Sequence, residues 1–217
     1  MEIATLNLTL GDTQRSLQYR KGTTDEGVIV RVLKHSGFNF GPLRRAKELS
    51  DHYRRMVEAE KTPLIVDVGA HIGAAAVYFA CSFPAARLIA IEPEHHNFEL
   101  LRTNTIGLPV ECLPAAVTPS AAPSSAGGVR IDDIYERNSQ SCLPFIAKID
   151  IERCEDRLFA ANTEWVDRTP LIILKLSDCL LPGTKSLRSF VEYVADRNRD
   201  FVYLNDNVFS IDRRFAA

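Results

Sequence analysis

Two glycines and an acid near two short apolar runs have the types and spacing of a nucleoside-binding site. Gly69 and Gly73 follow the apolar run Leu64–Val68, and Glu92 follows the next run, Arg87–Ile91. Glycine has no Cβ and adopts positive φ readily, so a ligand can approach the backbone at such a turn. An acid at the tip of the next strand can accept hydrogen bonds from both hydroxyls of a ribose. The pattern predicts a nucleoside site that includes Gly69 and Glu92.

The residues between the glycines narrow the choice of nucleoside. The dinucleotide pattern G-x-G-x-x-G is absent because its middle glycine is His71, and no Gly-Lys-Ser/Thr follows the strand as in a P-loop. Asp67 lies two residues before the turn, where its charge would repel phosphate and attract a cation. This favours S-adenosylmethionine (SAM), which has an amino group and a sulfonium and no phosphate. The alternative is a buried strand with packing glycines and no ligand.

Composition sets the class of protein. The chain has 217 residues, 46% of them hydrophobic, which suits one α/β domain with additions. Its formal net charge of −2 gives no sign of a nucleic-acid partner, and no run is long enough to span a membrane. The five cysteines are odd in number and never spaced C-x-x-C, so we expect reduced thiols, no zinc site and a cytoplasmic location. No His, Asp and Glu cluster has the spacing of a metal site.

Alternating apolar runs and helical segments position these residues. We expect an N-terminal extension over residues 1–60, with a hairpin (3–10 and 16–20) and helices from Thr24 to Lys34 and from Pro42 to Glu60. The SAM-binding domain is expected over 61–217. Further expected strands cover 109–113, 145–149 and 171–176, helices cover 74–80, 94–105, 152–165 and 185–197, and a terminal antiparallel hairpin covers 201–211. Residues 118–128 are expected to form a surface loop.

With these elements placed, the sequence resembles the FkbM-type SAM-dependent methyltransferases. The segments that carry the resemblance are Val66–Gly73, Ile91–Glu94, Val129–Ile134, Lys148–Glu152, Leu180–Gly183 and Asn207–Ile211. The family implies an α/β fold, the Rossmann-like class I methyltransferase fold, with a seven-stranded mixed sheet, helices on both faces and an antiparallel C-terminal hairpin.

The resemblance also implies roles for individual residues. Glu92 would bind the ribose, Asp67 would lie near the methionine amino group, and Asp150 would lie near the sulfonium and the acceptor. The remaining expected cofactor contacts are Gly69, Ala70, His71, Gly73, Pro93 and Ala115. The expected catalytic residues are Asp150, Glu152 and Asp178, because a carboxylate could take the proton of an acceptor hydroxyl. Asp150 and Glu152 could equally be the cap and first-turn acid of a helix.

Three positions depart from the family pattern. Arg153 replaces a glycine, Lys175 replaces a glutamate and Ser177 replaces a histidine. The resemblance implies SAM-dependent O-methylation of a hydroxyl on a sugar or small natural product. The first alternative is a SAM-binding protein that has lost catalysis and has a regulatory or partner role, and the second is an NAD-linked oxidoreductase. The acceptor, metal dependence and oligomeric state stay open.

Overall fold

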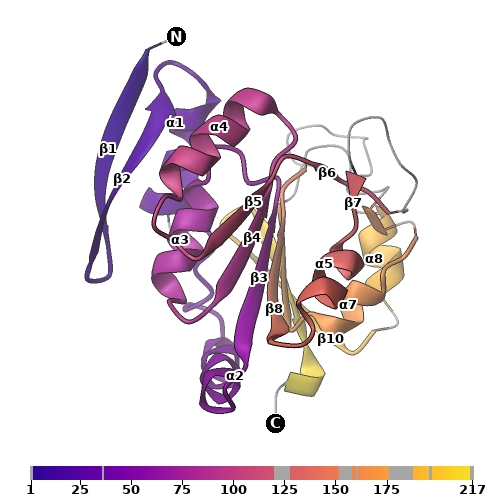
Figure 1. The fold of residues 1–217 in the computed structure, drawn as a ribbon. Coiled ribbons are helices and arrows are strands. Elements are labelled where there is room, and N and C mark those ends of the chain that lie inside the picture. The colour runs from indigo at the N-terminus through magenta and orange to yellow at the C-terminus, as the bar shows by residue number, and fades with distance from the viewer. Residues whose placement is uncertain are drawn as a thin grey trace.

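A seven-stranded mixed sheet forms the centre of the protein (Figure 1). The computed structural model describes residues 2–35, 37–119, 128–151, 158–159, 161–175, 188–195 and 197–215. The strand order is β10-β11-β9-β8-β3-β4-β5, and only β11 pairs antiparallel with its neighbours. The strands are β3 (Thr62–Val68), β4 (Arg87–Ile91), β5 (Val110–Leu113), β8 (Cys142–Ile149), β9 (Leu171–Lys175), β10 (Arg199–Leu204) and β11 (Asn207–Asp212).

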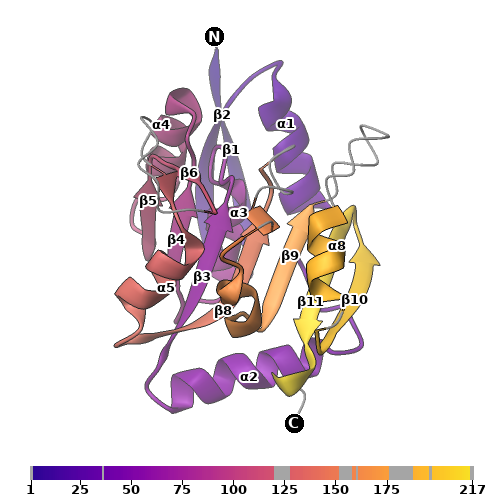
Figure 2. The ribbon, with the colours of Figure 1, turned by 90° about the vertical axis from the view of Figure 1, so that its right-hand side faces the viewer.

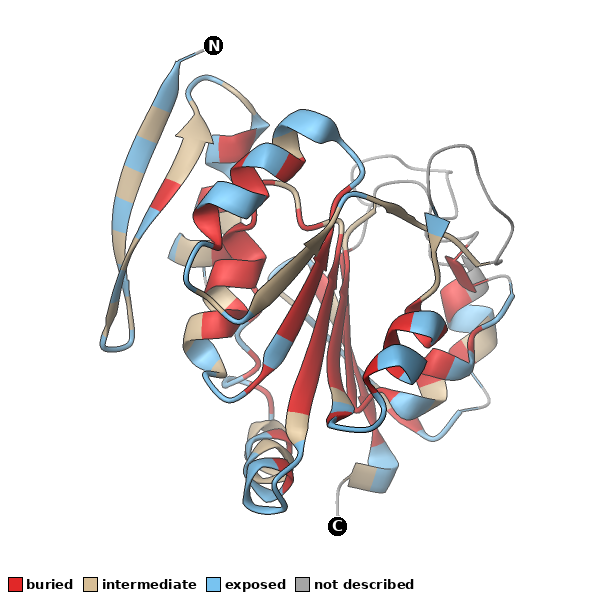
Figure 3. Ribbon diagram, in the orientation of Figure 1, coloured by how far each residue is buried: buried red, intermediate tan, exposed pale blue. Residues whose placement is uncertain are grey.

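Helices cover both faces of the sheet, which explains why its central strands consist mainly of apolar residues. All five residues of β9 are buried, as expected for a strand between two helical layers. One face packs on α2 (Ala46–Glu58), α3 (Ala74–Ser82) and α4 (His95–Asn104), and the other on α5 (Ile131–Asn138), α7 (Glu164–Arg168) and α8 (Arg188–Val194). The buried positions follow these two interfaces in Figure 3.

The N-terminal residues add a hairpin and a short helical segment to the first face. Strands β1 (Ile3–Leu10) and β2 (Thr13–Arg20) pair antiparallel, and α1 (Thr24–Ile29) continues into the π-helix η1 (Val30–Lys34). Figure 2 shows α1 at the end of the sheet where the parallel strands terminate. The described chain also contains β6 (Ala116–Val117), which pairs with β7 (Gly128–Val129), and the 3₁₀ turn η2 (Arg213–Phe215).

One buried amide fastens this hairpin to the body of the protein. The side chain of Asn104, at the end of α4, accepts a hydrogen bond from Gln18 N at 2.7 Å. It donates to Gln18 O at 2.9 Å and to Ile72 O at 2.7 Å. Asn104 thus joins β2, α4 and the segment that follows β3.

The expected fold class is confirmed, as are the N-terminal and C-terminal hairpins. Two helix boundaries are wrong. The helix expected from Pro42 begins at Ala46, because Leu43 and Ala46 first close turns onto the carbonyls of Phe40 and Leu43. The helix expected over 152–165 does not continue through 161–163, where Asn162 has a φ of +52°. Residues 152–157, 160 and 120–127 of the expected helix and loop lie outside the described residues.

Within the described ranges, none of the helices combines the length and apolar character needed to cross a lipid bilayer.

Replacing Asn104 by alanine should lower the free energy of unfolding by roughly 2–3 kcal/mol, because buried backbone groups of Gln18 and Ile72 lose their partners. Asn138→Ala is the matched control. Asn138 is also buried, but its side chain makes one hydrogen bond, within its own helix, so about 1 kcal/mol is expected. Urea denaturation measures both. Equal costs for the two variants would show that Asn104 does not anchor the hairpin.

Candidate functional site

A cavity of about 580 Å³ opens at the carboxyl ends of the parallel strands. The chain builds the sheet from β3 toward β5 and then returns to place β8 on the other side of β3. Such a reversal leaves a crevice outside the strand ends, which is where open α/β sheets bind ligands. The ends of β3, β4, β8 and β9 line the cavity, and α1 and η1 form one wall.

Gly69, at the end of β3, is required by the backbone of the neighbouring strand. Its φ is +73°, and a Cβ there would lie 2.0 Å from the carbonyl oxygen of Asp150. Gly69 also lines the cavity. Gly73 has a φ of +86°, but it is absent from the cavity lining, and its Cβ would meet Leu101 of α4 at 2.8 Å. The second glycine therefore serves helix packing rather than contact with a ligand.

The backbone amides of this turn are already used within the protein. The N–H groups of Gly69 and Ala70 both donate to Ile91 O at 3.0 Å, and that of Gly73 donates to Ala70 O at 2.9 Å. The N–H of His71 donates to Glu92 Oε2 at 2.9 Å. A nest of free N–H groups for a phosphate is therefore missing at these four positions.

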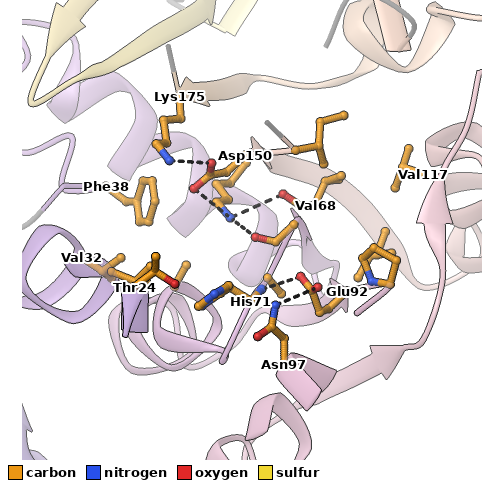
Figure 4. Close-up of a pocket in the computed structure, with 18 of the residues that line it drawn as sticks. Thr24, Val32, Phe38, Val68, His71, Glu92, Asn97, Val117, Asp150 and Lys175 are labelled. Carbon is orange, nitrogen blue, oxygen red and sulfur yellow. Dashed lines mark hydrogen bonds and ion pairs between the residues drawn. The ribbon is translucent and has the colours of Figure 1, made fainter. Parts of the chain in front are cut away.

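Glu92 is buried at the end of β4 and lines the cavity. Besides the bond from His71, its Oε1 accepts from Glu94 N at 3.0 Å and from Asn97 Nδ2 at 3.3 Å. A carboxylate has about four lone-pair positions on its two oxygens. One position on Oε2 therefore remains for a hydroxyl donor in the cavity (Figure 4).

Lys148 is a buried cation at the centre of the site. Its Nζ lies 2.8 Å from Asp67 Oδ1 and donates to Gly69 O at 2.7 Å. It also lies 4.0 Å from Asp150 Oδ2, and Asp150 Oδ1 lies 3.1 Å from Lys175 Nζ. These dashed contacts around Asp150 appear in Figure 4.

The two acids of this cluster differ in protonation behaviour. Burial raises the pKa of Asp67, and the Lys148 ammonium offsets that rise only in part. Burial alone would also raise the pKa of Asp150, but the charges of Lys148 and Lys175 hold it below the usual value. Asp150 is therefore an ionised, ion-paired carboxylate and a weak base, which argues against its expected catalytic role.

His71 connects the cavity to the N-terminal segment. Burial lowers its pKa, with Asp25 and Glu92 opposing that shift, so the ring is neutral at pH 7. Its Nε2 lies 3.7 Å from Asp25 Oδ1. Asp25 is fully buried and forms a two-point ion pair with Arg20, which in turn donates to Asn97 Oδ1. The wall formed by α1 is thus tied to Glu92 through Asn97.

Most of the expected cofactor contacts meet at this cavity. The expected contacts that line it are Gly69, Ala70, His71, Glu92, Pro93, Ala115 and Asp150. Asp67 does not reach it, because its side chain is fully buried behind the turn and paired with Lys148. Glu152 and Asp178 lie outside the described residues.

Several cavity residues were not predicted from the sequence, among them Lys148, Arg31 and Phe38. Lys148 carried a usable signal, since a charge inside an otherwise apolar strand requires a buried partner. No sequence pattern marked Arg31 or Phe38, because these residues reach the cavity only through the packing of the N-terminal segment. No group of three or more His, Cys, Asp or Glu in the described segments is arranged to hold a metal ion.

Comparison with known proteins supports the fold. No protein-family model matches the chain, and no curated protein matches it. Among solved structures, the bifunctional kinase-methyltransferase WbdD superposes with a TM-score of 0.53 at 12% identity, over 88% of this chain and 43% of WbdD. The fold is that of Rossmann-like methyltransferases. At this identity the likeness concerns the fold alone, and the chain spans less than half of WbdD.

Two further structures match over nearly their whole length, with lower TM-scores. TomG from Streptomyces achromogenes, an O-methyltransferase solved in complex with SAM, gives 0.46 at 15% identity, over 88% of this chain and 91% of TomG. The SAH-bound methyltransferase PaMTH1 from Podospora anserina gives 0.44 at 11% identity, over 89% and 96%.

Replacing Gly69 by alanine should destabilise the protein by at least about 3 kcal/mol, because the new methyl group would overlap the Asp150 carbonyl. The control is Gly107→Ala. Gly107 has a similar φ of +75° but no atom near its Cβ position, so a cost of about 1–2 kcal/mol is expected from backbone strain alone. Chemical denaturation compares the two, and similar costs would contradict the close approach of β3 and β8 at Gly69.

Proposed function

We propose that the protein is a SAM-dependent methyltransferase that transfers the methyl group to a hydroxyl of a sugar or small natural product. The observation that carries the proposal is the buried Glu92 carboxylate, which keeps one acceptor position beside the Gly69 turn. The acceptor class and the O-methylation come from the FkbM resemblance alone.

The cavity residues fit SAM. Glu92 would accept a hydrogen bond from a ribose hydroxyl through Oε2. Pro93, Ala115 and Val117 line the cavity and offer apolar surface for a flat purine ring. When bound, SAM would supply a methyl group on a positively charged sulfur, next to the ionised carboxylate of Asp150.

A phosphate-containing dinucleotide fits this turn less well. The charge of Asp67 does not decide the question, because Lys148 compensates it. The stronger argument is that the amides of Gly69, Ala70, His71 and Gly73 are all engaged by the protein itself. A pyrophosphate is normally held by such amides at the start of a helix. This favours SAM over the NAD alternative.

A SAM-binding protein without catalysis is the second candidate. It is favoured by Lys175, which stands at the position of a family glutamate and pairs with Asp150 at 3.1 Å. The carboxylate of Asp150 therefore forms an ion pair with a described lysine and is a poor base. Binding and catalysis need separate experiments.

Calorimetric titration of S-adenosylhomocysteine (SAH) into the native protein and a Glu92→Gln variant tests cofactor binding. The variant should bind about 10–100-fold more weakly, because a charged hydrogen-bond acceptor for the ribose is lost. Glu99→Gln, an exposed acid on the same loop-helix segment, should leave the affinity unchanged. Thermal melting confirms that the variants are folded, and NADH should give no binding heat.

Equal SAH affinity in the native and Glu92→Gln proteins would remove Glu92 from the site. Tight binding of NADH with no binding of SAH would overturn the proposed function in favour of the oxidoreductase.

A further inference from the structure

Three cations of the cavity act on a single carboxylate. Arg31 of η1, Lys148 of β8 and Lys175 of β9 line the same cavity. All three lower the pKa of Asp150 through their charges, although burial opposes them. We call Arg31, Lys148 and Lys175 the cationic end of the cavity. Glu92 is the other acid of the described lining; it directly follows β4 and accepts a hydrogen bond from His71 of the glycine turn.

Among the described residues, two members of the cationic end form ion pairs with acids and the third does not. Lys148 pairs with Asp67 at 2.8 Å, and Lys175 pairs with Asp150 at 3.1 Å. Arg31 forms no ion pair with any described acid, and its Nε is buried without a hydrogen-bond partner. His71 adds no charge because burial keeps its ring neutral. Within the described lining, an anionic ligand would therefore find Arg31 uncompensated.

The chemistry of Arg31 indicates what kind of ligand would bind there. A guanidinium has five N–H donors in a planar fork that matches the two oxygens of a carboxylate. Its hydration is weaker than that of an ammonium group, so it is suited to pairing away from bulk water. A carboxylate at this position would satisfy the buried Nε and balance the remaining charge.

We propose that Arg31 binds a carboxylate group of a ligand in this cavity. The proposal rests on the proposed methyltransferase function, which supplies two sources for that group. One is the methionine carboxylate of SAM, and the other is an acceptor that carries a carboxylate as well as its hydroxyl. In both cases Arg31, on the wall formed by η1, recognises the charge.

The experiment uses Arg31→Gln, which keeps a polar, though shorter, side chain and removes the charge. Lys34→Gln is the matched control, because Lys34 lies on the same π-helix, is exposed and does not line the cavity. Arg31→Lys is a second variant that keeps the charge and loses the fork, and melting curves establish that each variant is folded. The first probe is SAH. The second is D-glucuronate added to the SAH-loaded protein, with D-glucose as its uncharged counterpart.

Two results support the proposal and separate the sources. If Arg31 binds the cofactor carboxylate, SAH affinity falls about tenfold or more in Arg31→Gln and less in Arg31→Lys. If Arg31 binds the acceptor, SAH affinity is unchanged, while glucuronate binds the native protein more tightly than glucose does and loses that preference in Arg31→Gln. Lys34→Gln should match the native protein in both titrations.

The proposal is overturned if SAH affinity is the same in Arg31→Gln and native protein and glucuronate shows no Arg31-dependent preference over glucose. That result leaves the proposed function standing, because SAH still binds. Failure of SAH to bind the native protein is the separate result that removes the function itself.

Discussion

The buried ammonium group of Lys148 is the interaction on which the rest of the site depends. Asp67 and Lys148 are directly paired residues of the parallel strands β3 and β8, and their side chains form an ion pair at 2.8 Å. The same ammonium donates to the carbonyl of Gly69. It therefore holds the glycine turn against β8, at the point where the order of the strands reverses. Removing one partner of such a buried pair typically costs about 3–5 kcal/mol, because the other charge is left uncompensated.

The acids of the site differ in their partners: two carboxylates pair with lysines, and one accepts hydrogen bonds from N–H groups. Asp67 neutralises Lys148 behind the turn, and Asp150 is held ionised between two lysines. Glu92 is the acid that keeps acceptor capacity toward the cavity, while its other lone pairs fix His71, Glu94 and Asn97. Glu92 can therefore still accept a hydrogen bond in the cavity, whereas Asp150, the carboxylate expected to act as a base, is a weak one.

The sequence predicted the fold because apolar runs, glycines and strand-end acids are local signals. The run Leu64–Val68 and the acid Glu92 at the tip of β4 were placed correctly, and with them the cavity at the strand ends. The partners of charged residues were not predictable in this way. Asp67 and Lys148 are 81 residues apart in sequence and meet only because β8 returns to the side of β3. For that reason the sequence did not show that Asp67 is buried behind the turn, and its role at a ligand amino group stays a prediction.

The start of α2 and the position of Arg31 also depend on contacts between segments that are distant in the sequence. Turns at Leu43 and Ala46 precede α2, and Arg45 there forms an ion pair with the distant Asp200, so the helix begins after the proline that marked its expected start. Arg31 belongs to the wall of the cavity only because the N-terminal segment folds over the strand ends, and no spacing in the sequence records that contact.

A crystal structure of the protein grown with SAH would show directly whether this cavity binds the cofactor through Glu92. We expect the nucleoside in the cavity at the ends of β3 and β4, with a ribose hydroxyl within hydrogen-bond distance of Glu92 Oε2 and the purine against Pro93, Ala115 and Val117. SAH bound at another surface, or a cavity in which Glu92 makes no contact with the bound nucleoside, would contradict this expectation.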